Sequence, residues 1–347
     1  MLILFYHNFL KKQITIWSGF IMLKKLLAGT ALALLLAACG DEEATPKDNE
    51  KKEDQVSEAQ ADSKGDKAAD KESGYPNETL LVDAKWLNEH VSDENIVIID
   101  ARSEGFEAGH IGGAVALPTS QLNDINNEVD GFLLGEEDFT KLAQSLGINQ
   151  DSTVVVYDDG NALSATRVFY ALEYYGLKNQ VKVLNGGYPA WLIEGNEVAT
   201  DATTATAGNF VAKADAKLQS SREDVEALLD SDDVVILDTR SEAEYKGEDL
   251  RKNANGGHIP GAVHQEWTTA LQENEQGLTV FLDYEDLKKN FEAVGAEKDK
   301  TIIPYCQTNV RGAHTYFSLR LLGYEDVRPY EGSWAEWGNA GDTEIEA

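Results

Sequence analysis

One cysteine, Cys306, stands between an apolar run and an arginine in the segment "YCQTNVRGAH" (305–314). The run "TIIPY" before it predicts a strand, and we expect a helix to begin near Arg311. A strand-to-helix turn directs backbone N–H groups at one place, where they bind an anion or lower the pKa of a thiol. Arg311 adds a planar cation that suits an oxyanion. The spacing predicts a reactive thiolate; the alternative is a small buried cysteine without reactivity.

The second cysteine, Cys39, follows two lysines and a short apolar run that ends in "LAAC". This is the layout of a secretory signal, and its end resembles a bacterial lipobox. The resemblance implies that residues 1–38 are removed and that lipidated Cys39 holds the protein outside the cytoplasm, on the bacterial cell membrane. The apolar run is too short to favour a spanning helix, although an uncleaved signal anchor is the alternative. Residues 1–21 add nothing that a signal needs, which suggests a start codon assigned too early.

The chain is strongly acidic, with 30 Lys and Arg against 61 Asp and Glu. Removal of residues 1–38, which hold four lysines and no acid, leaves 26 against 61 and a net charge of −35. Such a surface repels nucleic acid, so we expect no nucleic-acid partner. It also lacks a basic patch for anionic lipid, so membrane attachment depends on the lipid alone. We expect neither a metal nor a cofactor.

An internal repeat divides the remainder of the chain. Two stretches of the first half recur in the second, at 95–118 and 233–267 and at 153–191 and 301–337. Before them lies a charged segment with few large apolar residues, which predicts a disordered tether. A Thr/Ala-rich stretch between the copies predicts a linker. The expected parts are a signal, the tether, a first domain, the linker and a second domain, at 1–38, 39–75, 76–200, 201–216 and 217–347.

Each copy alternates short apolar runs such as "NIVIID", "TVVVY" and "VKVL" with longer helical patterns. This alternation predicts an α/β fold with parallel sheets covered by helices on both faces. Sites in such sheets lie at the carboxyl ends of the strands, where Cys306 falls. Pro304 cannot donate to a ladder, so we expect it where pairing on its side has ended.

From about residue 76 the chain resembles the tandem-domain rhodanese sulfurtransferases. The resemblance rests on "GHIPGAV" (257–263), "CQTNVR" (306–311) and "GSWAEWGN" (332–339), and on "YDDGN" and "LNGGYPAW" in the first copy. It implies two tandem rhodanese-like domains and sulfur transfer through a persulfide on Cys306. The implied partners are a small anionic sulfur donor such as thiosulfate and an acceptor, either cyanide or a thiol.

We expect catalysis by Cys306 and substrate binding by the loop after it and by one upstream arginine, namely Arg311, Gln307, Thr308, Asn309, Val310 and Arg240. The pair Asp238 and Arg240 recurs as Asp100 and Arg102 in the first copy, which favours a structural ion pair. Asp158 stands where the second copy has Cys306, so the first copy is expected to be silent and to form one wall of the site.

Other classes of function stay open at this point. Four residues separate Cys306 from Arg311, whereas phosphatase and arsenate reductase loops generally have five, which favours sulfur chemistry. Glu244 stands where several animal rhodaneses carry a substrate-binding arginine, and nearby Lys246 is a candidate replacement. The donor is therefore thiosulfate or, alternatively, 3-mercaptopyruvate. A surface module that binds sulfur or a partner without turnover is the non-enzymatic alternative.

Overall fold

The computed structural model describes residues 74–347. The predicted signal, the lipid attachment site Cys39 and nearly all of the predicted tether lie outside the described residues. Within residues 74–347, no helix has both the length and the apolar character needed to cross a membrane. Tyr75, near the start of this part, is buried, and its hydroxyl donates a hydrogen bond to the carbonyl of Leu282.

The first half of the described chain contains these strands and helices in order: β1 (Leu81–Val82), α2 (Ala84–His90), β2 (Ile96–Asp100), β3 (His110–Ile111), β4 (Val115–Ala116), α3 (Glu136–Ser145), β5 (Thr153–Tyr157), α4 (Leu163–Tyr174), β6 (Val181–Leu184), α5 (Gly187–Ile193) and β7 (Val198–Ala199). The second half continues with α6 (Arg222–Leu228), β8 (Val234–Asp238), α7 (Glu242–Tyr245), β9 (Val263–His264), β10 (Leu271–Glu273), β11 (Thr279–Phe281), α8 (Tyr284–Glu292), β12 (Thr301–Tyr305), α9 (Val310–Leu321) and α10 (Ser333–Trp337). Short 3₁₀ turns cover Glu78–Leu80, Phe106–Ala108, Thr119–Leu122, Ala216–Leu218 and Trp267–Ala270.

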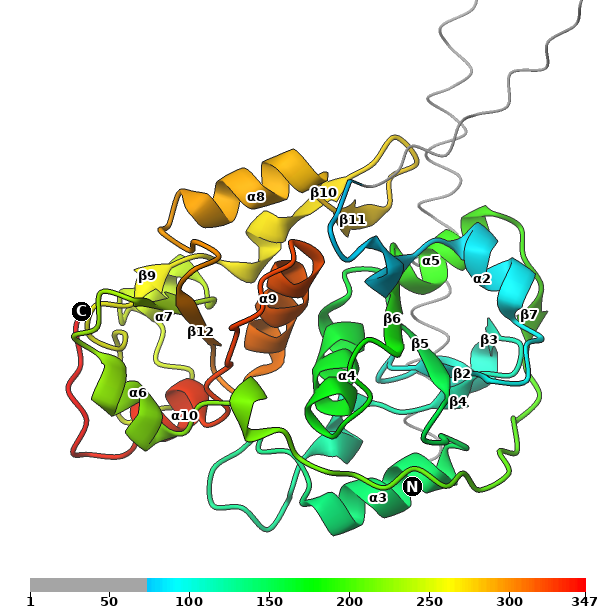
Figure 1. Ribbon diagram of the computed structural model, residues 1–347, viewed down its shortest axis with the longest axis horizontal. Helices are drawn as coiled ribbons and strands as arrows, with labels where there is room; N and C mark the ends of the chain where they lie inside the picture. Colours follow the sequence, from blue (N-terminus) through cyan, green and yellow to red (C-terminus); the bar gives the residue numbers. More distant parts are fainter. Residues whose placement is uncertain (1–73) are drawn as a thin grey trace, which may run out of the picture. The chain divides into compact units, whose positions relative to one another are not determined.

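The first sheet has the strand order β1-β6-β5-β2-β4, and every neighbouring pair is parallel. Its central strand β5 is buried on both faces (Figure 1). Val154 and Val156 belong to the cluster that includes α3 and α4, whereas Val155 and Tyr157 belong to the cluster that includes α2 and α5. This two-sided burial explains why "TVVVY" is apolar throughout and does not alternate.

The second sheet repeats this plan with β12-β8-β9, again parallel. Pro304 pairs with Leu237 of β8 inside the ladder. On its other side, the carbonyl of Pro304 still accepts a hydrogen bond from Tyr330 N at 3.0 Å. Pairing on that side therefore continues through the carbonyl, and the expectation that it had ended is wrong. Since proline supplies no N–H there, the neighbouring segment pairs only through isolated bridges such as Ile302 with Val327.

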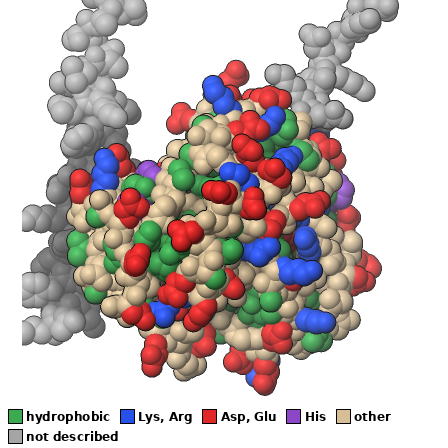
Figure 2. Space-filling view, turned by 60° about the vertical axis from the view of Figure 1, so that its left-hand side comes forward, with side chains coloured by type: hydrophobic (Ala, Val, Ile, Leu, Met, Phe, Trp, Pro, Cys, Tyr) green, Lys and Arg blue, Asp and Glu red, His purple; other side chains and the backbone are tan. Residues whose placement is uncertain are grey.

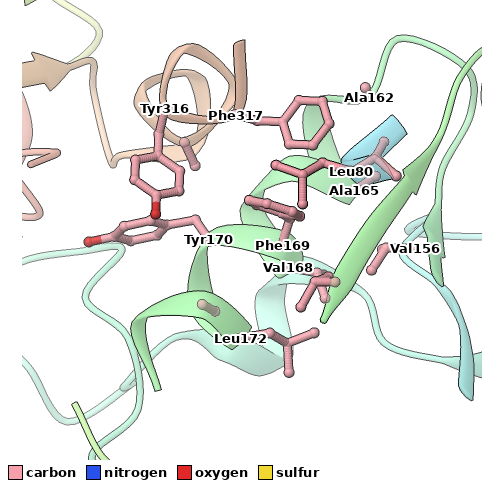
Figure 3. Packing of buried hydrophobic residues seen from close by; sticks show 14 of the residues in the cluster. Leu80, Val156, Ala162, Ala165, Val168, Phe169, Tyr170, Leu172, Tyr316 and Phe317 are labelled. Carbon is pink, nitrogen blue, oxygen red and sulfur yellow. The ribbon is translucent and has the colours of Figure 1, made fainter. Parts of the chain in front are cut away.

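Helices α4 and α9 lie side by side and join the two halves (Figure 1). Phe169 meets Phe317 edge-on at a centroid distance of 4.8 Å, and Tyr170 meets Tyr316 in the same way at 5.2 Å (Figure 3). One continuous apolar cluster therefore spans both halves. The outer face of the second sheet packs against α6 and α10 in a separate cluster. The predicted α/β architecture with two parallel-sheet domains is confirmed.

Two further segments tie the halves together. The β10–β11 hairpin of the second half places Leu278 in the apolar cluster around α2 and α5, and Phe281 N donates to Asn185 Oδ1 at 3.2 Å. The segment between the halves packs on the first half through the buried Phe210. Acidic side chains are spread over the face seen in Figure 2, as the net charge requires.

Candidate functional site

Cys306 follows β12 directly and is 1% exposed. We call residues Cys306–Asn309, together with the first turn of α9, the Cys306 loop. Asn309 closes it in the left-handed conformation, with φ 55° and ψ 19°, and α9 begins at Val310. The first N–H groups of a helix have no partners within it, so those of α9 are directed at the loop. The structure thus has the predicted strand-to-helix turn, with the thiol at the helix N-terminus.

The start of α10 fixes the shape of this loop. Ser333 Oγ accepts hydrogen bonds from Cys306 N at 3.3 Å and from Asn309 N at 3.1 Å, and donates to Tyr330 O at 2.9 Å. Ser333 is fully buried and has a positive φ of 51°. A non-glycine residue in this conformation costs energy and persists only where its surroundings hold it. Ser333 therefore positions the loop backbone.

Arg311 forms a bidentate ion pair with Glu244 of α7. Nη1 lies 2.6 Å from Oε2 and Nη2 lies 2.9 Å from Oε1. Burial raises the pKa of the Glu244 carboxyl, but the hydrogen bonds and charge of Arg311 outweigh it and bring the pKa to about 2. Burial lowers the pKa of Arg311, but the hydrogen bonds and charges of Glu244 and Cys306 outweigh burial, so the pKa lies above its usual value. Arg311 is thus a permanent cation beside Cys306, and its Nη1 and Nη2 each donate one hydrogen bond to Glu244.

The matching loop of the first half, Asp158–Ala162, contains a carboxylate where the second half has the thiol. Asp158 Oδ1 accepts N–H bonds from Gly160 and Ala162 at 2.9 and 3.1 Å. Oδ2 accepts bonds from Ser164 and Ala165 at 2.9 and 3.2 Å. Burial raises the pKa of Asp158, while these four donors act in the opposite direction. This geometry shows that the fold directs N–H groups at a single anionic side chain, and here the chain's own carboxylate fills the site.

The two loops differ in length by one residue. Each ends in a left-handed residue before its helix, Ala162 in the first half and Asn309 in the second. Counted from that residue, Ser164 stands where Arg311 stands. The first half therefore lacks both the thiol and the cation.

Arg240 lies deep beneath the site, where it is 1% exposed. Its Nε and Nη2 donate to both oxygens of Asp238, and Nη2 also donates to Gly257 O at 2.6 Å. Its guanidinium lies 4.4 Å from the ring centroid of Trp334. The first half repeats this arrangement with Arg102, which is bound by Asp100 and Gly109 O. Its presence in the half without a nucleophile favours a structural role for both arginines.

Gln307 and Thr308 line a surface cavity. The Gln307 amide exchanges two hydrogen bonds with Asn253, at 2.9 and 3.0 Å. The cavity, of about 440 Å³, lies between residues 128–130 of the first half and residues 251–253 of the second. Its lining carries both charges, with Arg251 and Lys252 as basic side chains and Glu128 and Asp130 as acidic ones.

The remaining residues singled out from the sequence lie outside the loop. His258 stacks on Tyr245 at a centroid distance of 3.7 Å, as His110 of the first half stacks on Phe106 at 3.9 Å, so both histidines pack against aromatic rings. Lys246 is half exposed and pairs with Glu242 on the surface. No group of three or more potential metal ligands occurs within residues 74–347.

Sequence reasoning missed Arg167, Glu331 and Ser333. Arg167 of α4 is buried and paired with Glu331, which also accepts a hydrogen bond from Asn309 Nδ2 at 2.6 Å. The available signal was Arg167 itself, a lone basic residue inside the apolar pattern "LSATRVFYALEY". A buried arginine in such a helix needs an acidic partner.

The fold and the loop define a two-domain α/β protein with a cysteine in the turn between a strand and the N-terminus of a helix. The family model described as "Rhodanese-like domain" matches residues 83–194 and 221–340. The chain therefore belongs to the rhodanese-like family, with two copies of the domain.

Known relatives agree with this placement. The "sulfur carrier protein TtuD" of Thermus thermophilus is 34% identical over 280 residues, which cover 77% of this chain and 96% of the relative. A "putative thiosulfate sulfurtransferase SseA" of Mycobacterium bovis is 35% identical over 281 residues, covering 77% and 91%. The crystal structure of the 3-mercaptopyruvate sulfurtransferase SseA from Escherichia coli matches with a TM-score of 0.65 and 30% identity, over 74% of this chain and 98% of that one. The family is thus one of sulfurtransferases, whose named members differ in their donors.

Proposed function

We propose that this protein transfers sulfane sulfur from thiosulfate to cyanide or a thiol through a persulfide on Cys306. The Cys306 thiolate attacks the outer sulfur of the donor, the donor S–S bond breaks, and sulfite leaves with the electron pair. The acceptor then attacks the outer sulfur of the persulfide and regenerates the thiolate. The observation that carries this proposal is the position of Cys306 in a loop whose counterpart binds the Asp158 carboxylate through four N–H groups.

The residues of the loop have separate roles in this proposal. The N–H groups at the start of α9 stabilise the thiolate and the persulfide anion, as four N–H groups stabilise Asp158. Arg311 supplies the cation that draws the sulfonate end of thiosulfate toward Cys306. Gln307, Thr308 and Val310 shape the entrance, and Arg240 supports the loop from below.

A second donor, 3-mercaptopyruvate, is favoured by one observation. Glu244 holds two nitrogens of Arg311, whereas Arg251 and Lys252 line the cavity beside Gln307 and Thr308. A carboxylate bound in that cavity would pair with these basic side chains, against the repulsion of Glu128 and Asp130, which line the same cavity. The relative from Escherichia coli is named for this donor.

Steady-state kinetics with both donors separate the candidates. We expect the wild type to have a higher kcat/KM with thiosulfate than with 3-mercaptopyruvate. Arg251→Ala should lower the kcat/KM for 3-mercaptopyruvate and leave that for thiosulfate unchanged. A higher kcat/KM of the wild type with 3-mercaptopyruvate would contradict the assignment of thiosulfate as the donor and favour 3-mercaptopyruvate. Hydrolysis of an aryl phosphate at a comparable rate would contradict sulfur transfer altogether.

We also propose that the protein is exported and held on the membrane by lipid on Cys39. The support is the basic, apolar and small-residue order of residues 22–39, together with the acidic composition, which offers anionic lipid no electrostatic attraction.

A further inference from the structure

Two buried ion pairs connect the halves of the chain along helices α4 and α9. Near the Cys306 loop, Arg167 Nη2 lies 2.7 Å from Glu331 Oε1, and the side chains are 1% and 2% exposed. Toward the end of α9, Arg320 Nε lies 3.1 Å from Glu173 Oε2, and the side chains are 7% and 0% exposed. Between Arg167 and Glu173 in the sequence, α4 carries Phe169 and Tyr170, whose rings meet those of Phe317 and Tyr316 of α9 (Figure 3). The pairs are therefore closely matched in burial and chemistry.

Of these two pairs, the first reaches the Cys306 loop. Arg167 Nη1 donates to Asn309 O at 3.4 Å, and Asn309 Nδ2 donates to Glu331 Oε2 at 2.6 Å. The pair thus binds both the backbone and the side chain of the left-handed residue that closes the loop. Such a residue needs fixed neighbours to keep its conformation.

The Arg167–Glu331 pair also binds the backbone of the first half next to the loop. Arg167 Nη2 donates to Gly131 O at 2.6 Å, and Glu331 Oε1 accepts from Leu133 N at 3.1 Å. A side chain at Gly131, where φ is +98°, would meet Thr308 Cβ at 2.6 Å, so the two backbones are in close contact. The Arg167 guanidinium therefore joins Gly131 of the first half to Asn309 of the Cys306 loop.

The other pair makes its contacts elsewhere. Arg320 Nη2 donates to Asn179 Oδ1 at 2.9 Å, and Tyr316 donates to Glu173 Oε2 at 2.7 Å. None of these residues belongs to the Cys306 loop. A variant at Arg320 can therefore report the effect of breaking the interface without disturbing the loop.

The charge of Arg167 has no counterpart in the other half. His314 occupies the same register of α9, where it packs between Trp267 and Phe281. Burial lowers the pKa of His314 to about 3, so this side chain is neutral. Hence Arg167 of α4 is a buried cation near the Cys306 loop, whereas His314, the equivalent residue of α9 near the Asp158 loop, is uncharged.

The charged groups around the Cys306 loop come from four segments. Arg311 and Glu244 come from α9 and α7, Arg167 comes from α4, and Glu331 comes from the segment before α10. Burial lowers the pKa of Arg167, but the charges of Glu331 and Cys306 raise it, so the guanidinium stays protonated. Loss of Arg167 would remove a cation that interacts with Cys306, and the loss of a nearby opposite charge disfavours the thiolate.

We propose that Arg167, from the half without a nucleophile, is a positioning residue for sulfur transfer. It holds Asn309 and Gly131 in place and neutralises Glu331, so that the helix N-terminus faces a thiolate. This inference rests on the proposed role of Cys306. It gives the first half a direct part in the reactivity of the thiol.

The test compares Arg167→Met with the matched control Arg320→Met in the full-length chain. The rate of alkylation of Cys306 by iodoacetamide is followed against pH by mass spectrometry of the peptide that contains it. We expect the midpoint of the profile to rise by about one pH unit in Arg167→Met, within the range for a nearby charge, and to stay in place in Arg320→Met. Both variants are expected to lower the midpoint of thermal unfolding to a similar extent.

A milder pair covers the case in which Arg167→Met does not fold. Arg167→Lys keeps the charge but loses the fork that joins Gly131, Asn309 and Glu331, so kcat should fall about tenfold, as for a displaced catalytic group, with little change in the alkylation midpoint. Arg320→Lys should retain the wild-type kcat. The proposal would be overturned if the Arg167 variant and the matched Arg320 variant changed the alkylation midpoint and kcat equally, or if neither variant changed them. Alkylation needs no sulfur donor, so a wild type that never forms a persulfide would refute the proposed function separately.

Discussion

Replacement of Arg311 by alanine tests the electrostatics of the site most sharply. The substitution removes the cation beside Cys306 and leaves Glu244, whose side chain is 1% exposed, without its bidentate partner. Burial raises the pKa of Glu244, but the hydrogen bonds and charge of Arg311, together with hydrogen bonds from Ser241, bring it from an ordinary 4.5 to about 2. That difference corresponds to about 3 kcal/mol of stability at neutral pH. Because the Ser241 hydrogen bonds remain, we expect Arg311→Ala to lower the free energy of unfolding by at most about 3 kcal/mol at pH 7.

The sign of the pH dependence follows from the depressed pKa. The contribution of the pair is fully present above about 4.5 and is lost as the pH falls toward 2. The difference in unfolding free energy between wild type and Arg311→Ala should therefore shrink across this window. Urea denaturation at several pH values measures it. Arg222→Ala is the control, because the Asp342 partner of Arg222 is 67% exposed, and an exposed pair contributes at most about 1 kcal/mol.

Activity should fall in the same variant. A charge-assisted hydrogen bond to a donor oxyanion contributes on the order of 1.5 to 3 kcal/mol, so kcat/KM for thiosulfate should drop roughly ten- to a hundredfold. Lysine at this position should restore only part of the rate, since it keeps the charge and loses the fork. An unchanged thiosulfate rate would refute the role of Arg311. If wild type and Arg311→Ala have the same unfolding free energy, or if their difference does not depend on pH, the Arg311–Glu244 pair does not stabilise the fold as argued.

Three other substitutions have definite expected outcomes. Cys306→Ser should abolish transfer and leave the thermal unfolding midpoint intact; residual turnover above about 1% would contradict the covalent mechanism. Asp158→Cys should form no persulfide, because its loop has Ser164 where the other has Arg311; a persulfide there, detected by mass spectrometry, would mean that the first half is not silent. Cys39→Ala should release the protein from membranes or block its maturation; continued sedimentation with membranes after a salt wash would favour an uncleaved anchor.

The sequence was sufficient to predict the elements that depend on local pattern. The strands "TVVVY" and "VKVL" occupy the predicted residues, because strands buried on both faces need continuous apolar runs. The helix after Cys306 begins one residue before the predicted start. Pro304 was misjudged, since its carbonyl pairs with a segment more than twenty residues later, and the pattern around a proline carries no information about that segment.

Side-chain partners were harder to predict, because they depend on packing between distant segments. Arg311 was expected to face the donor, but its bidentate partner Glu244 lies 67 residues earlier in the chain. Arg167 and Glu331 are 164 residues apart and belong to different halves. Spacing within a motif therefore predicted the thiol and the cation of the loop, whereas their ion-pair and hydrogen-bond partners became visible only in the folded protein.

The central claim is that Cys306 carries sulfur as a persulfide. The most direct test is mass spectrometry of the full-length protein after incubation with thiosulfate, with the peptide that contains Cys306 analysed separately. We predict that this peptide gains the mass of one sulfur atom and that cyanide removes it, with thiocyanate formed in equal amount. An unmodified Cys306 thiol after exposure to both thiosulfate and 3-mercaptopyruvate would contradict the account.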